Sequence, residues 1–432
     1  MSNAYNFAKW PLVLFGALVS VRATVPEVLE AALGSCGKVH LTVSPLQDNY
    51  LELNWINWNC TSFAPDYIVL STKNLREEDE DTLSSTLTHI RTGDHPSGYY
   101  KTQVKFREPW LPGNWEFDQE RLRADEGEHC LPFWIASIKQ DVILDSRCLA
   151  IQPTWMYDNR QHLGRKKIGN LLIPGTHNSG SFTGIISYFE GYVLNQDRSV
   201  WTQLVFGIRY LDFRVGFVPG TGFYIYHDQV RVTRIEPILR EIRKFVQLAP
   251  QEVLFVDFHR FPFPRNFSQD LHRQFTELVY QHLGEHVVNP AGLQAGSGPT
   301  LNEIWSQNRS VVVSYADRAT VNQTPWLWHP IKQFWGDTNK LGTLKQYLYG
   351  AIYQHKSSTN PMWALMMELT PQPWDVVLRK NSLRNLAQGV NRQVTRWVRD
   401  EWFSDVNIVA TDYFLGNDLV RVAIEGNKAN PN

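Results

Sequence analysis

Histidine and arginine side chains that could act on a phosphate group occur at strand ends in the second half of the chain. His177 stands in LLIPGTHNSGSF, where residues 171–173 predict a short buried strand and the following Pro-Gly pair predicts a turn. His227 ends another apolar stretch, and Arg214 follows Asp212 by two residues, which places both on one face of a strand. Two histidines flanking a phosphodiester can deprotonate an internal hydroxyl and protonate the leaving oxygen, while an arginine binds the phosphate oxygens.

Carboxylates occur at comparable positions. Asp257 ends VLFVD, and Asp412 follows the apolar run IVAT. Because active sites of parallel α/β folds lie at the carboxyl ends of strands, we expect these groups to converge on His177. A carboxylate behind a histidine base fixes its tautomer and stabilises the imidazolium. The alternative, a histidine that only satisfies loop hydrogen bonds, explains a single residue but not the repeated pattern.

Beyond residue 153 the pattern alternates between short apolar strands and amphipathic helices. The pair Thr233 and Glu236 predicts a capping box at the start of a helix over 235–246. Six or more strands alternating with helices indicate an α/β fold with a parallel sheet, most economically a distorted TIM (β/α) barrel. An open doubly wound sheet is the alternative, although no glycine-rich nucleotide motif supports it.

The residues before this region follow a different pattern. Residues 39–43 and 50–55 alternate apolar with polar side chains, and turn residues separate them, which predicts a small all-β sandwich-like domain. This region contains all four cysteines, Cys36, Cys60, Cys130 and Cys148. We expect them to form disulfides, with three pairings open. No catalytic cluster occurs here, so we interpret residues 24–152 as an accessory domain.

The chain begins with features of secreted proteins. Lys9 precedes an apolar run over 10–21 that is about half of the ~20 residues a membrane span needs, and Ala23 offers a cleavage site. Residues 1–23 are therefore expected to be a signal peptide; an uncleaved signal anchor is the alternative. The sequence has no second hydrophobic span. Four glycosylation acceptors support secretion to the extracellular space; they are Asn59, Asn266, Asn308 and Asn322.

The overall charge excludes one class of partner. The chain has 42 basic and 43 acidic residues and a net charge of -1, so it presents no general argument for binding nucleic acid. The 16 tryptophans fit a large core, carbohydrate stacking or contact with a membrane interface, and composition does not choose among them.

Four motifs together resemble a known family. In order and spacing, IPGTHNSGSF, GIRYLDFRV, YIYHDQV and PQEVLFVDFHRF are similar to the X domain of phosphatidylinositol-specific phospholipases C, especially the compact bacterial and X-domain-only eukaryotic forms. The resemblance covers roughly residues 165–425 and is looser at TDYF. It implies a distorted TIM barrel over residues 153–432, and the N-terminal region lies outside it.

The resemblance also implies catalytic roles. His177 matches the general base that activates the inositol 2-hydroxyl, His227 the general acid that protonates the diacylglycerol oxygen, and Arg214 the phosphate-stabilising arginine. Asp412 would orient His177, and Asp212 would hold Arg214 or His227. The implied activity is that of a phosphoric diester hydrolase that cleaves an inositol phospholipid at a membrane surface to diacylglycerol and a cyclic inositol phosphate.

Departures from the family pattern affect the substrate and the metal. Asn178, His259 and Tyr315 are the expected substrate-binding residues, and each differs from the bacterial pattern, so a bare inositol lipid, a glycosylated one and another 2-hydroxy phosphodiester all remain open. No cofactor is expected. In a calcium-dependent enzyme the oxygen ligands would be Asn178, Asp212 and Asp257, but the charge of Arg214 opposes a dication there.

Two other classes of function remain as alternatives. The first is a catalytically weak X domain that serves as a secreted phosphoinositide or glycolipid headgroup-binding protein. The second is an interaction protein in which the N-terminal domain engages a partner and the barrel is a scaffold.

Overall fold

The computed structural model describes residues 37–56, 64–77, 85–107, 111–117, 129–183, 190–293, 298–355 and 362–429. The expected leader, Cys36, Asn59 and Cys60 lie outside these residues. The chain divides into two compact units: unit 1 comprises Met1–Leu41, Leu53–Tyr100 and Pro132–Cys148, and unit 2 comprises Thr42–Glu52, Lys101–Leu131 and Leu149–Asn432. A distinct N-terminal β domain is not confirmed, and the boundary expected at residue 152 stays a prediction.

The described part of the chain before residue 151 consists mainly of strands. They are β1 (Val39–Val43), β2 (Tyr50–Trp55), β3 (Tyr67–Ser71), β4 (Thr86–Arg91), β5 (Tyr99–Lys105), β6 (Cys130–Lys139) and β7 (Val142–Ala150). Two sheets result, with the orders β1-β2-β5 and β4-β3-β6-β7. Short strands were predicted here and are confirmed. Cys130 and Cys148 are disulfide-bonded.

The polar residues that alternate with apolar ones in β1 and β2 include the buried Thr42 and Glu52. Within unit 2, the Thr42 hydroxyl donates to Glu52 Oε2 at 3.0 Å, and Gln388 of α12 (Leu383–Trp397) donates to Glu52 Oε1 at 2.6 Å. The polar face of these strand segments therefore packs against a helix rather than water.

The main sheet lies in unit 2. Within the described residues it has nine strands, of which β10 (Gly222–His227) and β11 (Val230–Arg234) form an antiparallel hairpin attached to β9. The other seven are parallel, in the order β13-β12-β9-β8-β16-β15-β14. Their bounds are β8 (Ile173–Thr176), β9 (Tyr210–Val218), β12 (Leu254–Arg260), β13 (Val311–Tyr315), β14 (Lys332–Trp335), β15 (Trp363–Met366) and β16 (Ile408–Thr411).

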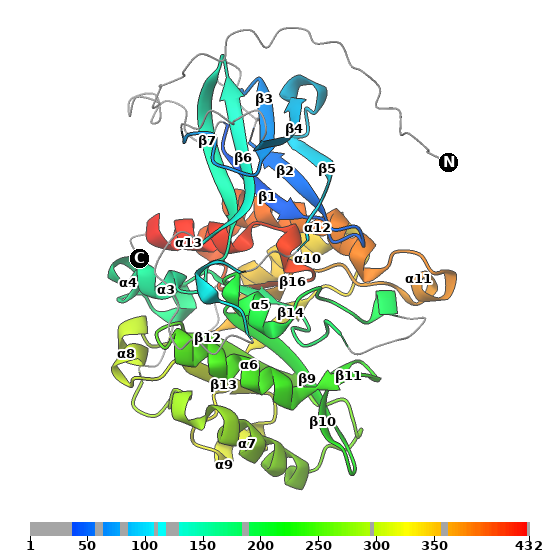
Figure 1. Cartoon of the computed structure of the whole chain (residues 1–432). Coiled ribbons are helices and arrows are strands. Elements are labelled where there is room, and N and C mark those ends of the chain that lie inside the picture. Colours follow the sequence, from blue (N-terminus) through cyan, green and yellow to red (C-terminus); the bar gives the residue numbers. More distant parts are fainter. Residues whose placement is uncertain are drawn as a thin grey trace, which may run out of the picture. The chain divides into compact units, whose positions relative to one another are not determined.

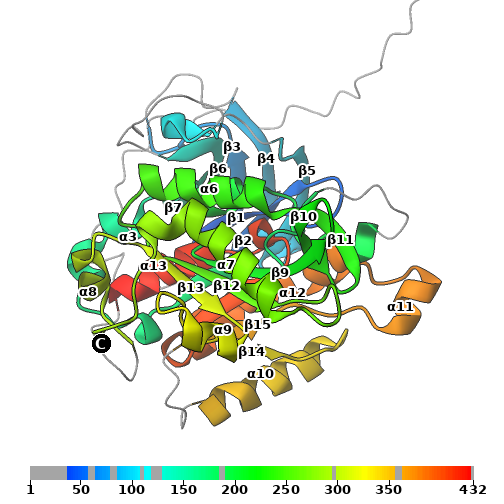
Figure 2. The ribbon, with the colours of Figure 1, turned by 90° about the horizontal axis from the view of Figure 1, so that it is seen from below.

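Helices connect these strands, as the alternating pattern predicts. Besides α12 they are α3 (Trp155–Asp158), α4 (Arg160–Leu163), α5 (Val200–Val205), α6 (Ile235–Leu248), α7 (Gln269–Leu283), α8 (Leu301–Ser306), α9 (Arg318–Gln323), α10 (Leu341–His355), α11 (Pro373–Leu378) and α13 (Leu419–Ala429). In Figures 1 and 2, α6 and α7 lie side by side along β12 and β13. The helix over 235–246 is confirmed, but its predicted capping box is wrong: the N-cap is Arg234, without a side-chain cap, because Thr233 belongs to β11.

The sheet is curled, so its ends approach each other. The Gln333 side chain of β14, at one edge, donates from Nε2 to Tyr210 Oη at 2.9 Å and to Asp212 Oδ1 at 3.0 Å, although β8, β16 and β15 separate the two strands in the sheet. Only strong curvature allows this contact. Within the described residues β13 and β14 do not pair with each other. The parallel α/β sheet is therefore confirmed, and its shape is a curled, incompletely closed barrel.

Side chains alternate between the inside of the curl and its helical cover. The inside is filled by an apolar cluster that includes Ile173, Tyr210, Phe255, Ala364 and Ile408. The Tyr210 ring lies so close to β8 that a Cβ at position 175 would be 2.6 Å from its Cδ1, which explains Gly175. Among the described residues no helix is long and apolar enough to cross a membrane.

A buried ion pair anchors the start of β9. Arg209 and Glu252 are both fully buried, and the Arg209 Nε and Nη2 donate to Glu252 Oε2 at 2.9 and 2.6 Å. Glu252 also accepts from the backbone N–H groups of Met156 and Tyr157 in α3. The pair therefore joins α3 to the strand that carries Asp212 and Arg214.

Removing one partner of this pair should destabilise the protein strongly. Glu252→Leu leaves the Arg209 charge buried without a counter-ion, so we expect the free energy of unfolding to fall by about 3–5 kcal/mol. Urea unfolding followed by tryptophan fluorescence measures the change. Asp270→Ala is the control: it removes an exposed pair with Arg273 and should cost less than about 1 kcal/mol. Equal losses in the two variants would contradict the assignment.

Candidate active site

A layer of polar side chains lies at the carboxyl ends of the parallel strands. Asp212 pairs with Asp257, and Thr176 pairs with both Thr411 and Leu211. Asp212 and Asp257, together with the residues that follow Thr176 and Thr411, therefore stand at one level on the inside of the sheet. The layer comprises Asp412, His177, Asp212, Asp257 and Ser314. It stands directly above the apolar interior, where few charged groups are otherwise found.

His177 has its two ring nitrogens held by groups of opposite charge. Nδ1 lies 2.9 Å from Asp412 Oδ1 and Nε2 lies 2.8 Å from Arg214 Nη2. Because a carboxylate only accepts and a guanidinium only donates, the neutral ring carries its proton on Nδ1 and presents a lone pair at Nε2. His177 is thus arranged as a proton acceptor. Asn195 supports Asp412, since its Nδ2 donates to Oδ1 and Oδ2 at 3.0 and 3.1 Å.

The pKa of His177 reflects this environment. His177 is 6 % exposed, and burial lowers its pKa, but the Glu368 and Asp412 carboxylates raise it. The net direction is upward.

Arg214 is the cation of the site. Its Nη2 lies 3.9 Å from Asp212 Oδ2, and its Nε is buried without a hydrogen-bond partner among the described residues. Burial raises the pKa of Asp212, but the charges of Arg214 and His177 lower it by more, so the net direction is downward. Asp212 therefore stays an anion beside Arg214, with one N–H group of Arg214 left to bind a ligand.

His227 reaches the site by a route that differs from the expected one. It was expected at the end of a barrel strand, but β10 runs antiparallel to β9 and folds back beside it, with Ile225 opposite Val215. The ring Nδ1 lies 2.7 Å from the Val193 carbonyl oxygen and donates to it, which leaves Nε2 to exchange a proton. Burial, followed by the Arg214 charge, lowers the pKa of His227.

The expected substrate-binding residues are placed differently from one another. Asn178 donates from its backbone N to Asp212 Oδ2 at 3.0 Å, and its Oδ1 is buried without a hydrogen-bond partner among the described residues. His259 Nδ1 lies 3.5 Å from Asp257 Oδ2. Tyr315 lies on the opposite face of its strand from Ser314, and its hydroxyl lies 2.8 Å from His272 Nδ1 among aromatic rings. The structure does not bring Tyr315 to the site.

Of the three residues that would ligate calcium, Asp212 and Asp257 already have hydrogen-bond partners, and only Asn178 Oδ1 has none among the described residues. Asp257 accepts from the hydroxyls of Tyr210 and Ser314 at 2.8 and 3.0 Å, and Asp212 accepts from Gln333 and from the Asn178 backbone. Arg214 adds a positive charge beside them. A dication needs several unoccupied oxygens, so this donor set does not fit Ca²⁺.

Three residues of the site were missed by sequence reasoning. Glu368 lies two residues beyond β15 and is 2 % exposed, with Oε1 3.9 Å from His177 Nε2. Glu368 follows an apolar strand as Asp412 does, so the same sequence signal could have identified it. Gln333 lies inside a short strand and Asn195 in a loop, so neither has a comparable signal.

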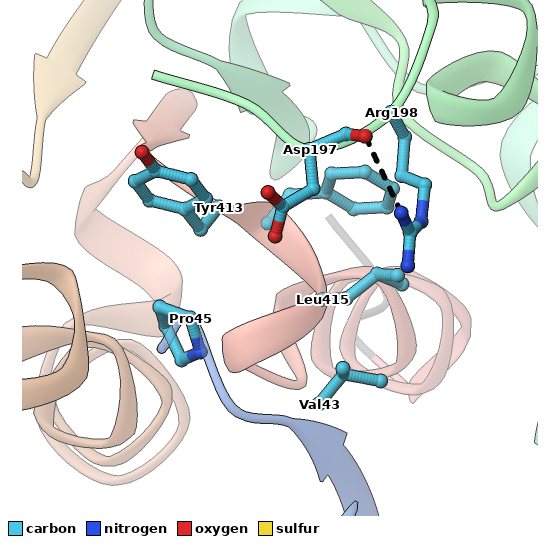
Figure 3. A pocket seen from close by; sticks show the side chains of 7 residues that line it. Val43, Pro45, Asp197, Arg198, Tyr413 and Leu415 are labelled. Atoms are coloured by element: carbon cyan, nitrogen blue, oxygen red, sulfur yellow. Dashed lines mark hydrogen bonds between the residues drawn. The ribbon is translucent and has the colours of Figure 1, made fainter. Parts of the chain in front are cut away.

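A small hollow elsewhere in unit 2 contains no acid–base pair of this kind. Figure 3 shows its lining, with Asp197, Arg198 and Tyr413 on one side and Val43 and Pro45 on the other. Asp197 is bound by Arg384, so its carboxylate already has a cation. Among the described residues, His177 and the groups that contact it therefore lie in the polar layer and not in this hollow.

Comparisons with known proteins identify relatives of this chain. The chain matches no protein-family model. It is 25 % identical over 308 residues to PI-PLC X domain-containing protein 1 of Mus musculus, covering 64 % of the chain and 86 % of that protein. Identity to the Homo sapiens protein of the same name is 25 % over 310 residues, covering 63 % and 90 %. The resemblance to X-domain proteins is thus confirmed.

A solved structure shows the same fold. A variant of phosphatidylinositol-specific phospholipase C from Staphylococcus aureus matches with a TM-score of 0.50 and 16 % sequence identity, covering 63 % of this chain and 97 % of that one. At this identity the likeness concerns the fold, which is of the TIM-barrel type.

The contact between His177 and Asp412 gives a prediction that needs no ligand. Asp412→Asn removes a carboxylate that raises the pKa of His177, so that pKa should fall. A pH titration of the imidazole by nuclear magnetic resonance measures it. Asp197→Asn, which removes a half-buried carboxylate paired with Arg384, is the control and should leave the titration unchanged. An unchanged or higher pKa in Asp412→Asn would show that the carboxylate does not act on His177.

Proposed function

We propose that the chain is a phosphodiesterase that cleaves an inositol phospholipid, or a related 2-hydroxy phosphodiester, to a cyclic phosphate and a free alcohol. The observation that carries the proposal is the environment of His177, whose Nδ1 faces a carboxylate while its Nε2 faces a guanidinium. This arrangement brings a proton acceptor and a phosphate-binding cation to one place. The names of the X-domain relatives and of the Staphylococcus aureus neighbour support phosphatidylinositol as the substrate.

In the first part of the reaction, the substrate hydroxyl transfers its proton to His177 Nε2, and its oxygen forms a bond to phosphorus. Asp412 stabilises the resulting imidazolium through Nδ1. Arg214 leaves Nε2 and donates to the phosphate oxygens, where negative charge grows in the transition state.

In the second part, the bond from phosphorus to the leaving oxygen breaks, and His227 Nε2 supplies the proton that this oxygen needs. The Val193 carbonyl fixes the His227 ring through Nδ1, so that Nε2 is the nitrogen available. The products are a five-membered cyclic phosphate and, from a phospholipid, diacylglycerol. No metal ion takes part in the proposed reaction.

One observation favours the second candidate, a headgroup-binding protein of low activity. Catalysis needs neutral His177 and protonated His227, but the pKa of His177 is raised and that of His227 is lowered. In the unbound protein both pKa shifts therefore oppose the productive protonation state. A bound phosphodiester anion beside His227 raises the pKa of that ring and offsets the difference.

An exposed apolar surface at the same end of the sheet supports a lipid substrate. Helix α11 follows the carboxyl end of β15 and projects outward in Figures 1 and 2. Trp374, Val377 and Leu378 are 73 %, 67 % and 57 % exposed, and the exposed Arg379 and Lys380 follow them. Tryptophan and aliphatic side chains beside basic ones bind the interface of anionic bilayers. The α11 surface would thus bring the site to its lipid.

We also propose that the protein is secreted. The expected leader lies outside the described residues, but Cys130 and Cys148 are disulfide-bonded, which suits an oxidising compartment. The three described glycosylation acceptors, Asn266, Asn308 and Asn322, have exposed side chains, as attachment of a glycan requires.

The proposed reaction is tested with purified protein and phosphatidylinositol vesicles, following the cyclic product by phosphorus resonance in the presence of a chelator. We expect turnover that the chelator does not lower, and a loss of at least about 100-fold in His177→Ala and in His227→Ala. His162→Ala, an exposed histidine on α4, is the control and should keep full activity. Headgroup binding without turnover in the unmodified protein would instead support the second candidate.

The α11 surface gives a separate prediction. Trp374→Ser with Leu378→Ser should weaken binding to anionic vesicles by about 10-fold or more, because two side chains lose their burial in lipid. Sedimentation with vesicles measures binding, and a water-soluble inositol phosphodiester should be cleaved at the original rate. Tyr353→Ser is the matched control. Tyr353 lies near the C-terminal end of α10, outside α11, and is 75 % exposed. A similar loss in the control would show that α11 is not the lipid-binding surface.

A further inference from the structure

Glu368 is a buried acid that the proposed mechanism does not use. It follows β15, in which Ala364 and Met366 face the apolar interior, and alternation places Glu368 on the same inner face. Met366 pairs with Ala410, so Glu368 stands at the level of Asp412 and His177. It is therefore part of the polar layer.

The carboxyl group of Glu368 lies 3.9 Å from His177 Nε2 but accepts no hydrogen bond from another described residue. Both of its oxygens are buried. Burial raises the pKa of Glu368 to about 7, so its carboxyl group is present in both protonated and ionised forms near neutral pH. Burying a polar group without a hydrogen bond is costly, and an apolar residue at the end of β15 would avoid that cost. The stability of the fold therefore gives no reason for a glutamate at position 368.

The position of Glu368 relative to His177 indicates that its carboxyl group contacts a bound ligand. Oε1 lies 3.9 Å from Nε2, the nitrogen that faces the substrate, whereas Asp412 already binds Nδ1. A hydroxyl oxygen at hydrogen-bond distance from Nε2 fits within reach of Oε1 as well, which leaves Oε2 for a neighbouring group. Arg214 lies at the same nitrogen, so phosphate and hydroxyl groups would be bound side by side.

We propose that Glu368 is a substrate-binding residue that hydrogen-bonds a second hydroxyl, next to the one that His177 deprotonates, so that the site selects headgroups with vicinal hydroxyls. This inference rests on the proposed function. Hydroxyl groups both donate and accept, so either protonation state of Glu368 can bind them. The preferred substrates are then phosphodiesters of cyclitols or other polyols rather than of alcohols with a single free hydroxyl.

Two lipids separate these classes. Phosphatidylinositol carries vicinal hydroxyls, whereas phosphatidyl-1,2-propanediol carries the nucleophilic hydroxyl and no second one. In Glu368→Leu we expect kcat/KM for phosphatidylinositol to fall by about 10- to 100-fold more than that for the propanediol lipid, because the accompanying change in the pKa of His177 affects both lipids alike. Glu368→Gln keeps a donor and an acceptor and should retain most of the preference. An equal loss on both lipids would overturn the proposal.

Separate control experiments test the folding of Glu368→Leu and the proposed function. Because Leu removes a buried carboxyl group that accepts no hydrogen bond from another described residue, the unfolding midpoint of Glu368→Leu should equal or exceed that of the unmodified protein. A lowered midpoint together with equal losses on both lipids would show a structural role. If the unmodified protein cleaves neither lipid, the proposed function fails and calorimetry decides the inference. Glu368→Leu should then weaken binding of inositol 1-phosphate but not of propanediol 1-phosphate, and equal binding in both proteins would overturn it.

Discussion

The parallel register of β15, β16, β8 and β9 is the constraint on which the site depends. It sets Glu368, Asp412, His177 and Asp212 at one level although they are far apart in sequence. A shift of one residue in any of these strands would turn its polar side chain out of the interior and replace it with a residue that packs against the helices. The apolar cluster beneath the layer opposes such a shift, because it accepts only one face of each strand.

Strand ends were the part of the site that the sequence could predict. The apolar runs before His177 and Asp412 are short, buried and bounded by turn residues, and they became β8 and β16. The face of each strand was harder to assign. Tyr315 follows an apolar run as Asp412 does, but it lies one position past Ser314, the residue that faces inward. The pairing of Asp257 with Ser314 shows that Ser314, and not Tyr315, faces inward. That pairing is known only from the register of β12 and β13.

Other parts of the site depend on three-dimensional relations that no local pattern contains. His227 returns to the site because β10 folds back on β9, and the sequence does not distinguish this hairpin from another parallel strand. Gln333 reaches Asp212 only because the sheet curls. The polar residues of β2 alternate with apolar ones, yet Glu52 is bound by Gln388 from a helix more than three hundred residues later. Polar residues in a strand can thus face another part of the chain as readily as water.

The contact between Arg214 and His177 determines what the unliganded protein does with alcohols and water. The lone pair of Nε2 is covered by the guanidinium, so the base is not accessible to a hydroxyl that arrives alone. Only a molecule that also carries an anion, able to draw Arg214 toward itself, uncovers the nitrogen. Sugars and polyols without a phosphate would leave the pair closed. The requirement for both groups in one molecule is thus built into the resting state, before any binding pocket selects among substrates.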